Sequence, residues 1–84
     1  MSQEIFSVAD DVECLVGWDV PMQTFFGQVY RVDEKGERAE DEPILWVGKK
    51  PEAIRTVDHL QELLRPRTVI PPVIRRRLFE IEID

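Results

Sequence analysis

The sequence has too few of the residues that build most catalytic and metal sites. It contains one cysteine, Cys14, and one histidine, His59. A structural zinc site takes four Cys or His ligands, so neither this metal site nor any cofactor site is expected. A single cysteine cannot form a disulfide within the chain, which favours a reducing compartment. No glycine-rich phosphate loop is present, because the four glycines are far apart: Gly17, Gly27, Gly36 and Gly48.

Long hydrophobic runs and a targeting segment are also missing. No apolar run approaches the ~20 residues of a membrane span. The first residues, Met1-Ser2-Gln3-Glu4, lack the basic start of a signal peptide. We therefore expect a cytoplasmic protein with no membrane contact. Its 84 residues predict a single domain, 1–84, that is too small to hold a large enzyme cavity.

Acidic residues outnumber basic ones, and the excess lies in the first half of the chain. The formal net charge is −6. Residues 1–50 hold eleven acids and five bases, whereas residues 51–84 hold six of each. Six arginines fall within residues 53–78, against two acids. This asymmetry favours charge pairing within the molecule or a protein partner recognised by charge, and the overall acidity disfavours generic nucleic-acid binding.

Three segments have the pattern of β-strands, near residues 12–18, 24–32 and 43–48. The first alternates apolar and polar residues, which predicts a half-buried strand with Cys14 facing the core. The second is apolar at both its odd and its even positions, which predicts a strand that lies between neighbours and is covered on both faces. Residues 1–11 have weaker periodicity and either form a short edge strand or lie loosely. The charged segment 33–42 is either a loop, which we favour, or an extended hairpin.

Two helices are predicted after the strands, near residues 56–65 and 71–80. Thr56 has the side chain of an N-cap, and Pro71 suits the start of the second helix. Residues 79–84 alternate between apolar and acidic side chains, so a short final strand is the alternative to a helix end. The order predicts an α+β fold, a three-stranded antiparallel β-meander followed by two helices packed on one face.

Short motifs in the chain resemble a family of small bacterial proteins of unknown function. They are a Gly-aromatic-Asp-x-Pro turn that leads into an aromatic strand, at residues 17–26, the pair Leu45-Trp46, and the helix start at Ile70-Pro71. The resemblance covers residues 14–78. It implies a compact α+β domain, and because the family has no established activity or catalytic residues, it leaves the function open.

Cys14 and His59 are the sole candidates for a nucleophile and its base. A thiol enzyme would need them within hydrogen-bonding distance and a third group to orient the base. Cys14 is on the same face of its predicted strand as Val12 and Val16, so it is expected in the core as a small apolar residue. His59 falls on the polar side of its helix. We therefore expect no catalytic site.

Two groups of residues are candidates for binding a partner. Trp18, Asp19 and Met22 could form an exposed anchor of the kind that dominates interfaces. Alternatively, Trp18 covers the end of the sheet and Asp19 binds the turn backbone. The second group is Arg75 and Arg76 on the last helix.

The arginines of the second half are also candidates for contacting nucleic acid. Three consecutive residues spread over 200° of a helix, so the run from Arg75 to Arg77 forms no single basic stripe. Arg77 falls within the apolar arc, so its side chain must extend to solvent or pair with an acid, such as Asp19 or one in the 37–42 loop.

The sequence thus favours a non-enzymatic protein-interaction module, a monomer or weak homodimer, with a protein partner. One alternative is a nucleic-acid-binding regulator that uses the C-terminal arginines, Arg65, Arg67 and Arg75 to Arg77. The other is a small enzyme that uses Cys14 and His59.

Overall fold

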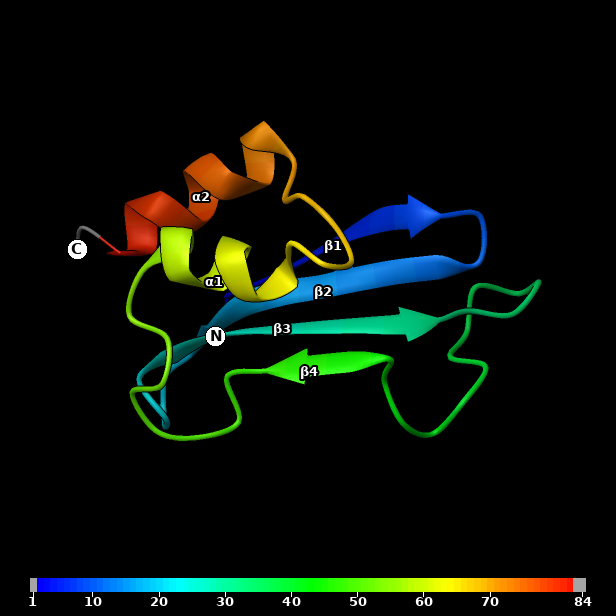
Figure 1. Ribbon diagram of the computed structural model, residues 1–84, viewed down its shortest axis with the longest axis horizontal. Coiled ribbons are helices and arrows are strands. Elements are labelled where there is room, and N and C mark those ends of the chain that lie inside the picture. Colours follow the sequence, from blue (N-terminus) through cyan, green and yellow to red (C-terminus); the bar gives the residue numbers. More distant parts are fainter. Residues whose placement is uncertain (1, 83–84) are drawn as a thin grey trace.

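The computed structural model describes residues 2–82 as a four-stranded antiparallel sheet with two helices on one side (Figure 1). The order of the strands in the sheet, β1-β2-β3-β4, is their order in the chain. The predicted α+β architecture is confirmed. The elements are β1 (Ser2–Ala9), β2 (Val12–Asp19), β3 (Thr24–Arg31), β4 (Leu45–Val47), α1 (Val57–Leu64) and α2 (Pro72–Glu82).

The sheet has one strand more than the three predicted. Strand β1 pairs with β2 from Ser2 opposite Trp18 to Ala9 opposite Val12, with an irregularity between Ser7 and Ala9. For Ser2–Ala9 the edge-strand alternative is therefore the right one. The pattern was weak because the face of β1 that is turned to the helices carries polar residues, and only Phe6 is buried in this strand.

The other predicted elements are present with small shifts at their ends. The third predicted strand shortens to Leu45–Val47, because Pro43 has no N–H to donate and Gly48 leaves the strand at a φ of 83°. The segment 33–42 is a loop with one isolated bridge, Val32 to Arg38, and no extended hairpin. The alternative of a final strand is wrong as far as Glu82, where α2 ends, and residues 83–84 lie outside the described part.

The hydrophobic core lies between the sheet and the two helices. Cys14 and Val16 of β2 and Phe25 and Val29 of β3 face the helices, because alternate residues of a strand share a face. The helices contribute Val57, Leu60, Leu64, Ile74 and Leu78, and the connections contribute Ile54 and Ile70.

A buried threonine attaches the connection before α1 to the sheet. The hydroxyl oxygen of Thr24 accepts a hydrogen bond from the backbone N–H of Ile54 at 2.8 Å. The backbone N–H of Phe25 donates to the Ile54 carbonyl at 2.9 Å. These bonds hold the chain close to the start of β3 before Thr56 caps α1 by accepting from the His59 N–H at 3.1 Å. The predicted N-cap is confirmed.

Candidate functional site

The second face of the sheet carries apolar side chains that neither α1 nor α2 covers. Residues that alternate with the core positions point to this side, which we call the helix-free face. It carries Ile5 of β1, Leu15 of β2, Phe26 and Tyr30 of β3, and Trp46 of β4.

Arg38 of the loop 33–42 covers Tyr30 on the helix-free face. The guanidinium carbon of Arg38 lies 4.3 Å from the centroid of the Tyr30 ring, a cation–π contact. Arg38 also donates a hydrogen bond from Nη2 to the side-chain oxygen of Gln28 at 2.7 Å. Burial, with the nearby Glu13 carboxylate, raises the pKa of Tyr30. Tyr30 is therefore enclosed and unavailable to a ligand.

The same face holds a shallow groove, which we call the open groove. Its volume is about 450 Å³. Trp46 is 46% exposed, and the Lys49 ammonium lies 5.1 Å from its ring centroid. The Phe26 ring lies over Gly17, where an added Cβ would come within 3.0 Å of it. The open groove is lined by Gln3, Leu15, Asp19, Met22, Phe26, Gln28, Trp46, Gly48 and Lys49.

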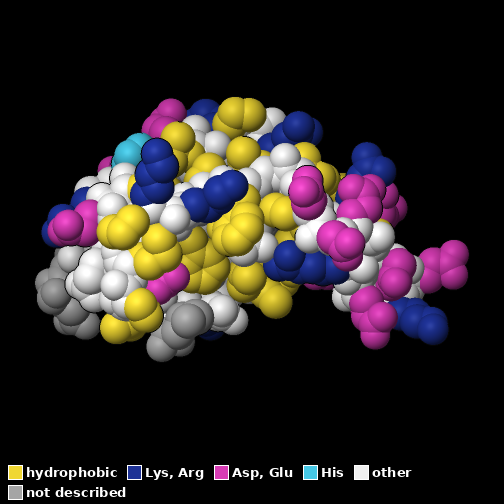
Figure 2. All heavy atoms as spheres, turned by 90° about the horizontal axis from the view of Figure 1, so that it is seen from below, with side chains coloured by type: hydrophobic (Ala, Val, Ile, Leu, Met, Phe, Trp, Pro, Cys, Tyr) yellow, Lys and Arg dark blue, Asp and Glu magenta, His cyan; other side chains and the backbone are white. Residues whose placement is uncertain are grey.

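Hydrophobic and acidic side chains gather in different places on the surface. Seen from the β4 side, hydrophobic side chains occupy the middle of the molecule (Figure 2). Acidic side chains crowd the end that carries the loop 33–42 and the Asp10-Asp11 turn, at the right of Figures 1 and 2. Trp46 and Lys49, which belong to the open groove, also line another depression together with the acids Asp41 and Glu42.

The turn between β2 and β3 divides the first group of predicted residues between the two faces. Asp19 accepts a hydrogen bond from the Met22 N–H at 3.2 Å, and both residues line the open groove. Trp18 points to the helix side, where it is half-buried and meets the Phe25 ring edge-on with centroids 4.9 Å apart. Trp18 therefore packs against the core, and Asp19 binds the turn backbone.

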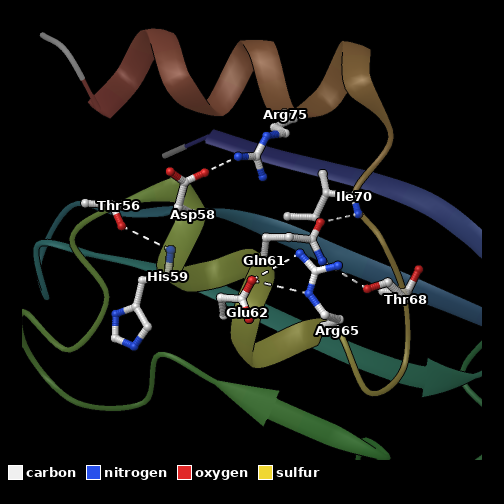
Figure 3. A network of polar contacts seen from close by, with 9 residues as sticks. All are labelled: Thr56, Asp58, His59, Gln61, Glu62, Arg65, Thr68, Ile70 and Arg75. Carbon is white, nitrogen blue, oxygen red and sulfur yellow. Dashed lines mark hydrogen bonds and ion pairs between the residues drawn. The ribbon is translucent and has the colours of Figure 1, made fainter.

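The arginines are distributed among separate acidic partners around the helices. Arg75 pairs with Asp58 of α1, and Arg65 donates from Nη2 to Glu62 at 3.1 Å (Figure 3). Arg77 pairs with Glu4 of β1 at 2.6 Å. The partners predicted for Arg77, Asp19 or the 37–42 loop, are wrong because strand β1 was not foreseen beside α2.

Arg75 and Arg76 lie on the opposite side of the sheet from Asp19 and Met22. They line a second depression, between the helices, together with Val57, Asp58, Pro72 and Phe79. The two groups of predicted binding residues therefore belong to different surfaces, with the sheet and core between them.

The structure does not bring Cys14 and His59 together as a reactive pair. Cys14 is fully buried in the core, and burial raises the pKa of its thiol to about 12. His59 is exposed on α1, and its ring points away from the surrounding polar network (Figure 3). A buried thiol with a raised pKa carries almost no thiolate at neutral pH.

Within the described residues 2–82, no three His, Cys, Asp or Glu side chains form a group that could hold a metal ion. Neither helix in this range has the length and apolar run required to cross a membrane. Comparisons of the chain with models of protein families, with curated proteins and with solved structures found no match.

Trp46 is a site residue that was not predicted from the sequence. Its signal was present, because it follows Leu45 in an apolar strand and therefore points to the other face. What the sequence did not show is that β4 pairs with β3 so that Trp46 lies opposite Gln28, close to Phe26 and the Asp19 turn.

Proposed function

We propose that this protein is a non-enzymatic protein-interaction module that binds a partner through the open groove. One observation carries the proposal: Trp46 is a large aromatic side chain, nearly half exposed, beside Leu15 and Phe26 on a sheet face that neither α1 nor α2 covers. Tryptophan is among the residues that contribute most to protein interfaces. An exposed apolar patch with polar residues around it is typical of a binding surface.

The groove also supports a particular partner chemistry. Asp19 and Lys49 supply one charge of each sign. A protein segment that inserts an apolar side chain beside Trp46 and presents polar groups to these residues fits this lining. Binding through such a surface depends on the apolar anchor for affinity and on the charged residues for orientation.

The test is a pull-down from native lysate with the tagged protein and two variants. Trp46→Ala removes the exposed anchor, and Phe79→Ala removes a comparably exposed aromatic from α2 as a matched control. We expect Phe79→Ala to retain the partner and Trp46→Ala to lose it, with both variants folded by circular dichroism. A partner retained equally by both variants would refute binding through the groove.

A second candidate function is binding of single-stranded nucleic acid. The observation in its favour is the Trp46–Lys49 contact on a sheet face, because a base can stack on an exposed aromatic ring while a nearby ammonium contacts phosphate. The arginines first considered for this role are weaker candidates, since Arg65, Arg75 and Arg77 are each paired with an acid. A gel-shift assay at about 50 mM salt, where phosphate contacts are strong, tests this function. Retardation that Trp46→Ala abolishes would favour it over a protein partner.

A further inference from the structure

Trp46 and Lys49 line both the open groove and a second depression. The second depression measures about 390 Å³, and residues 41–45 form the remainder of its lining. Leu45 packs against the core, whereas Trp46 points to the helix-free face. A depression that both residues line must lie along an edge of β4, and because β3 occupies one edge, it lies along the outer one. We call it the edge depression.

Apolar side chains are accessible on this side of the molecule. Figure 2 views the protein from the β4 side, and hydrophobic side chains occupy the middle of that view. Trp46 is the exposed residue of β4, and Ile44 and Leu45 of the edge depression are half-buried. The apolar anchor of the proposed function therefore lies where the open groove meets the edge depression.

The two depressions together carry more acidic than basic groups. Asp19 lines the open groove, and Asp41 and Glu42 line the edge depression. Among the described residues that line either depression, Lys49 is the one base, which leaves three acids against it. Complementary charge steers a partner toward a site, and like charge opposes binding. The lining therefore favours a basic segment and disfavours the phosphates of a nucleic acid.

The acids of the edge depression have no cationic partner in the part of the chain that the structure describes. Neither Asp41 nor Glu42 forms an ion pair there, whereas the preceding Glu40 takes part in one. Lys49 lines the same depression, but its ammonium lies over the Trp46 ring and forms no ion pair. Both carboxylates are exposed and thus available to a cation that a partner brings.

We propose that the partner of the open groove binds with a short extended segment that carries a basic residue. An apolar side chain of this segment lies beside Trp46, and its lysine or arginine lies in the edge depression beside Asp41 and Glu42. Neighbouring side chains of an extended chain point in opposite directions, so one segment can occupy both depressions. The inference rests on the proposed function, because it names the chemistry of the partner that this same site receives.

The experiment selects binders from random short peptides displayed on phage, with the full chain as the target. Peptides are kept when the wild type binds them and Trp46→Ala does not. We expect these peptides to share an apolar residue with a lysine or arginine within a few positions of it. Their affinity, measured with labelled synthetic peptides, should fall as the salt concentration rises, because salt screens exposed charge pairs.

Two pairs of charge reversals in the loop 33–42 test where the basic residue lies. Asp41→Lys with Glu42→Lys, which we call the edge variant, changes the edge depression. Glu34→Lys with Glu37→Lys makes the same change of net charge at exposed residues that line neither depression. We expect the edge variant to weaken peptide binding about tenfold and the control to weaken it much less. If the edge variant does not fold, Asp41→Asn with Glu42→Gln takes its place.

Replacing the basic residue of a selected peptide with glutamine should remove most of the difference between the wild type and the edge variant, because the two changes then act on one interaction. Trp46-dependent peptides without a basic residue, or peptides that bind the edge variant as tightly as the wild type, would overturn this inference and leave the proposed function in place. A selection that yields no Trp46-dependent peptide also overturns the inference, and the pull-down with Trp46→Ala then decides the proposed function separately.

Discussion

The side-chain oxygen of Gln61 accepts a hydrogen bond from the backbone N–H of Ile70 at 2.7 Å. The amide nitrogen of the same side chain donates to the Thr68 carbonyl at 3.1 Å (Figure 3). Gln61 is one of the few polar residues that are buried. A single amide on α1 thus satisfies two backbone groups of the connection and positions the start of α2.

Replacing Gln61 with leucine should destabilise the protein strongly. The apolar side chain leaves the Ile70 N–H and the Thr68 carbonyl without this partner, and each such buried group costs about 1–3 kcal/mol. We expect a fall of about 2–4 kcal/mol in the free energy of unfolding, measured by urea denaturation. The neighbouring Glu62→Gln change removes an exposed ion pair to Arg65 and should cost less than about 1 kcal/mol. Equal effects of the two changes would contradict this role of Gln61.

The two tryptophans should respond in opposite ways to substitution by alanine. Trp18→Ala removes a ring that packs edge-on against Phe25, and we expect a loss of about 2–4 kcal/mol in stability. Trp46→Ala removes an exposed ring and should cost about 1 kcal/mol or less. Thermal or urea unfolding of both variants measures the difference. If Trp46→Ala proved the more damaging change, the helix-free face would have a structural role instead of a binding role.

Gly17→Ala should disturb the sheet between β1 and β3. An added Cβ would collide with the Ser2 carbonyl oxygen and come within 3.0 Å of the Phe26 ring. Because the nearest atom belongs to the backbone, β1 must shift, and we expect a loss of about 2 kcal/mol or more. Gly36→Asn is the control, since Gly36 has a φ of 80° with open space around it and asparagine tolerates that conformation. Urea unfolding, with amide exchange in β1, compares the two variants.

The stability of the protein should fall at alkaline pH because of Cys14. Burial raises the pKa of this thiol to about 12 in the folded state, above its ordinary value. The folded state therefore keeps a proton that the unfolded state has lost, so this contribution is complete below pH 9 and decreases as pH rises from 9 toward 12. Relative to Cys14→Ala, the wild type should lose up to about 1.4 kcal/mol per pH unit in that range. Urea unfolding of both proteins at several pH values measures this difference, and a difference that does not change with pH would contradict the raised pKa.

The elements with a strong local signal were predictable from the sequence. The alternation from Val12 to Trp18 and the Thr56 N-cap each depend on a few adjacent residues, and the structure confirms both elements. Strand β1 was harder to foresee because its inward positions include Ser2 and Glu4, and the acid is accommodated there by Arg77 from the far end of the chain.

The candidate site was less predictable because it depends on distant pairing. Asp19 and Met22 were identified from their turn, and they do lie at the open groove. Trp46 reaches the same groove only because β4, three residues long, pairs with β3 after the loop 33–42. The hydrogen bonds between Thr24 and Ile54 also join residues that are far apart in the sequence, and neither residue type predicts them.

The agreement between strand order and chain order has a consequence for folding kinetics. Every strand of the sheet pairs with the strand that precedes or follows it, and the β1–β2 and β2–β3 hairpins close over short turns. Proteins rich in such local contacts fold faster than those built on non-local pairing. Contacts between the sheet and later segments, such as Arg77 with Glu4 and Thr24 with Ile54, need the later part of the chain and are expected to form after the sheet. Docking of the helices would then be the late step of folding, and substitutions at these contacts should mainly speed unfolding.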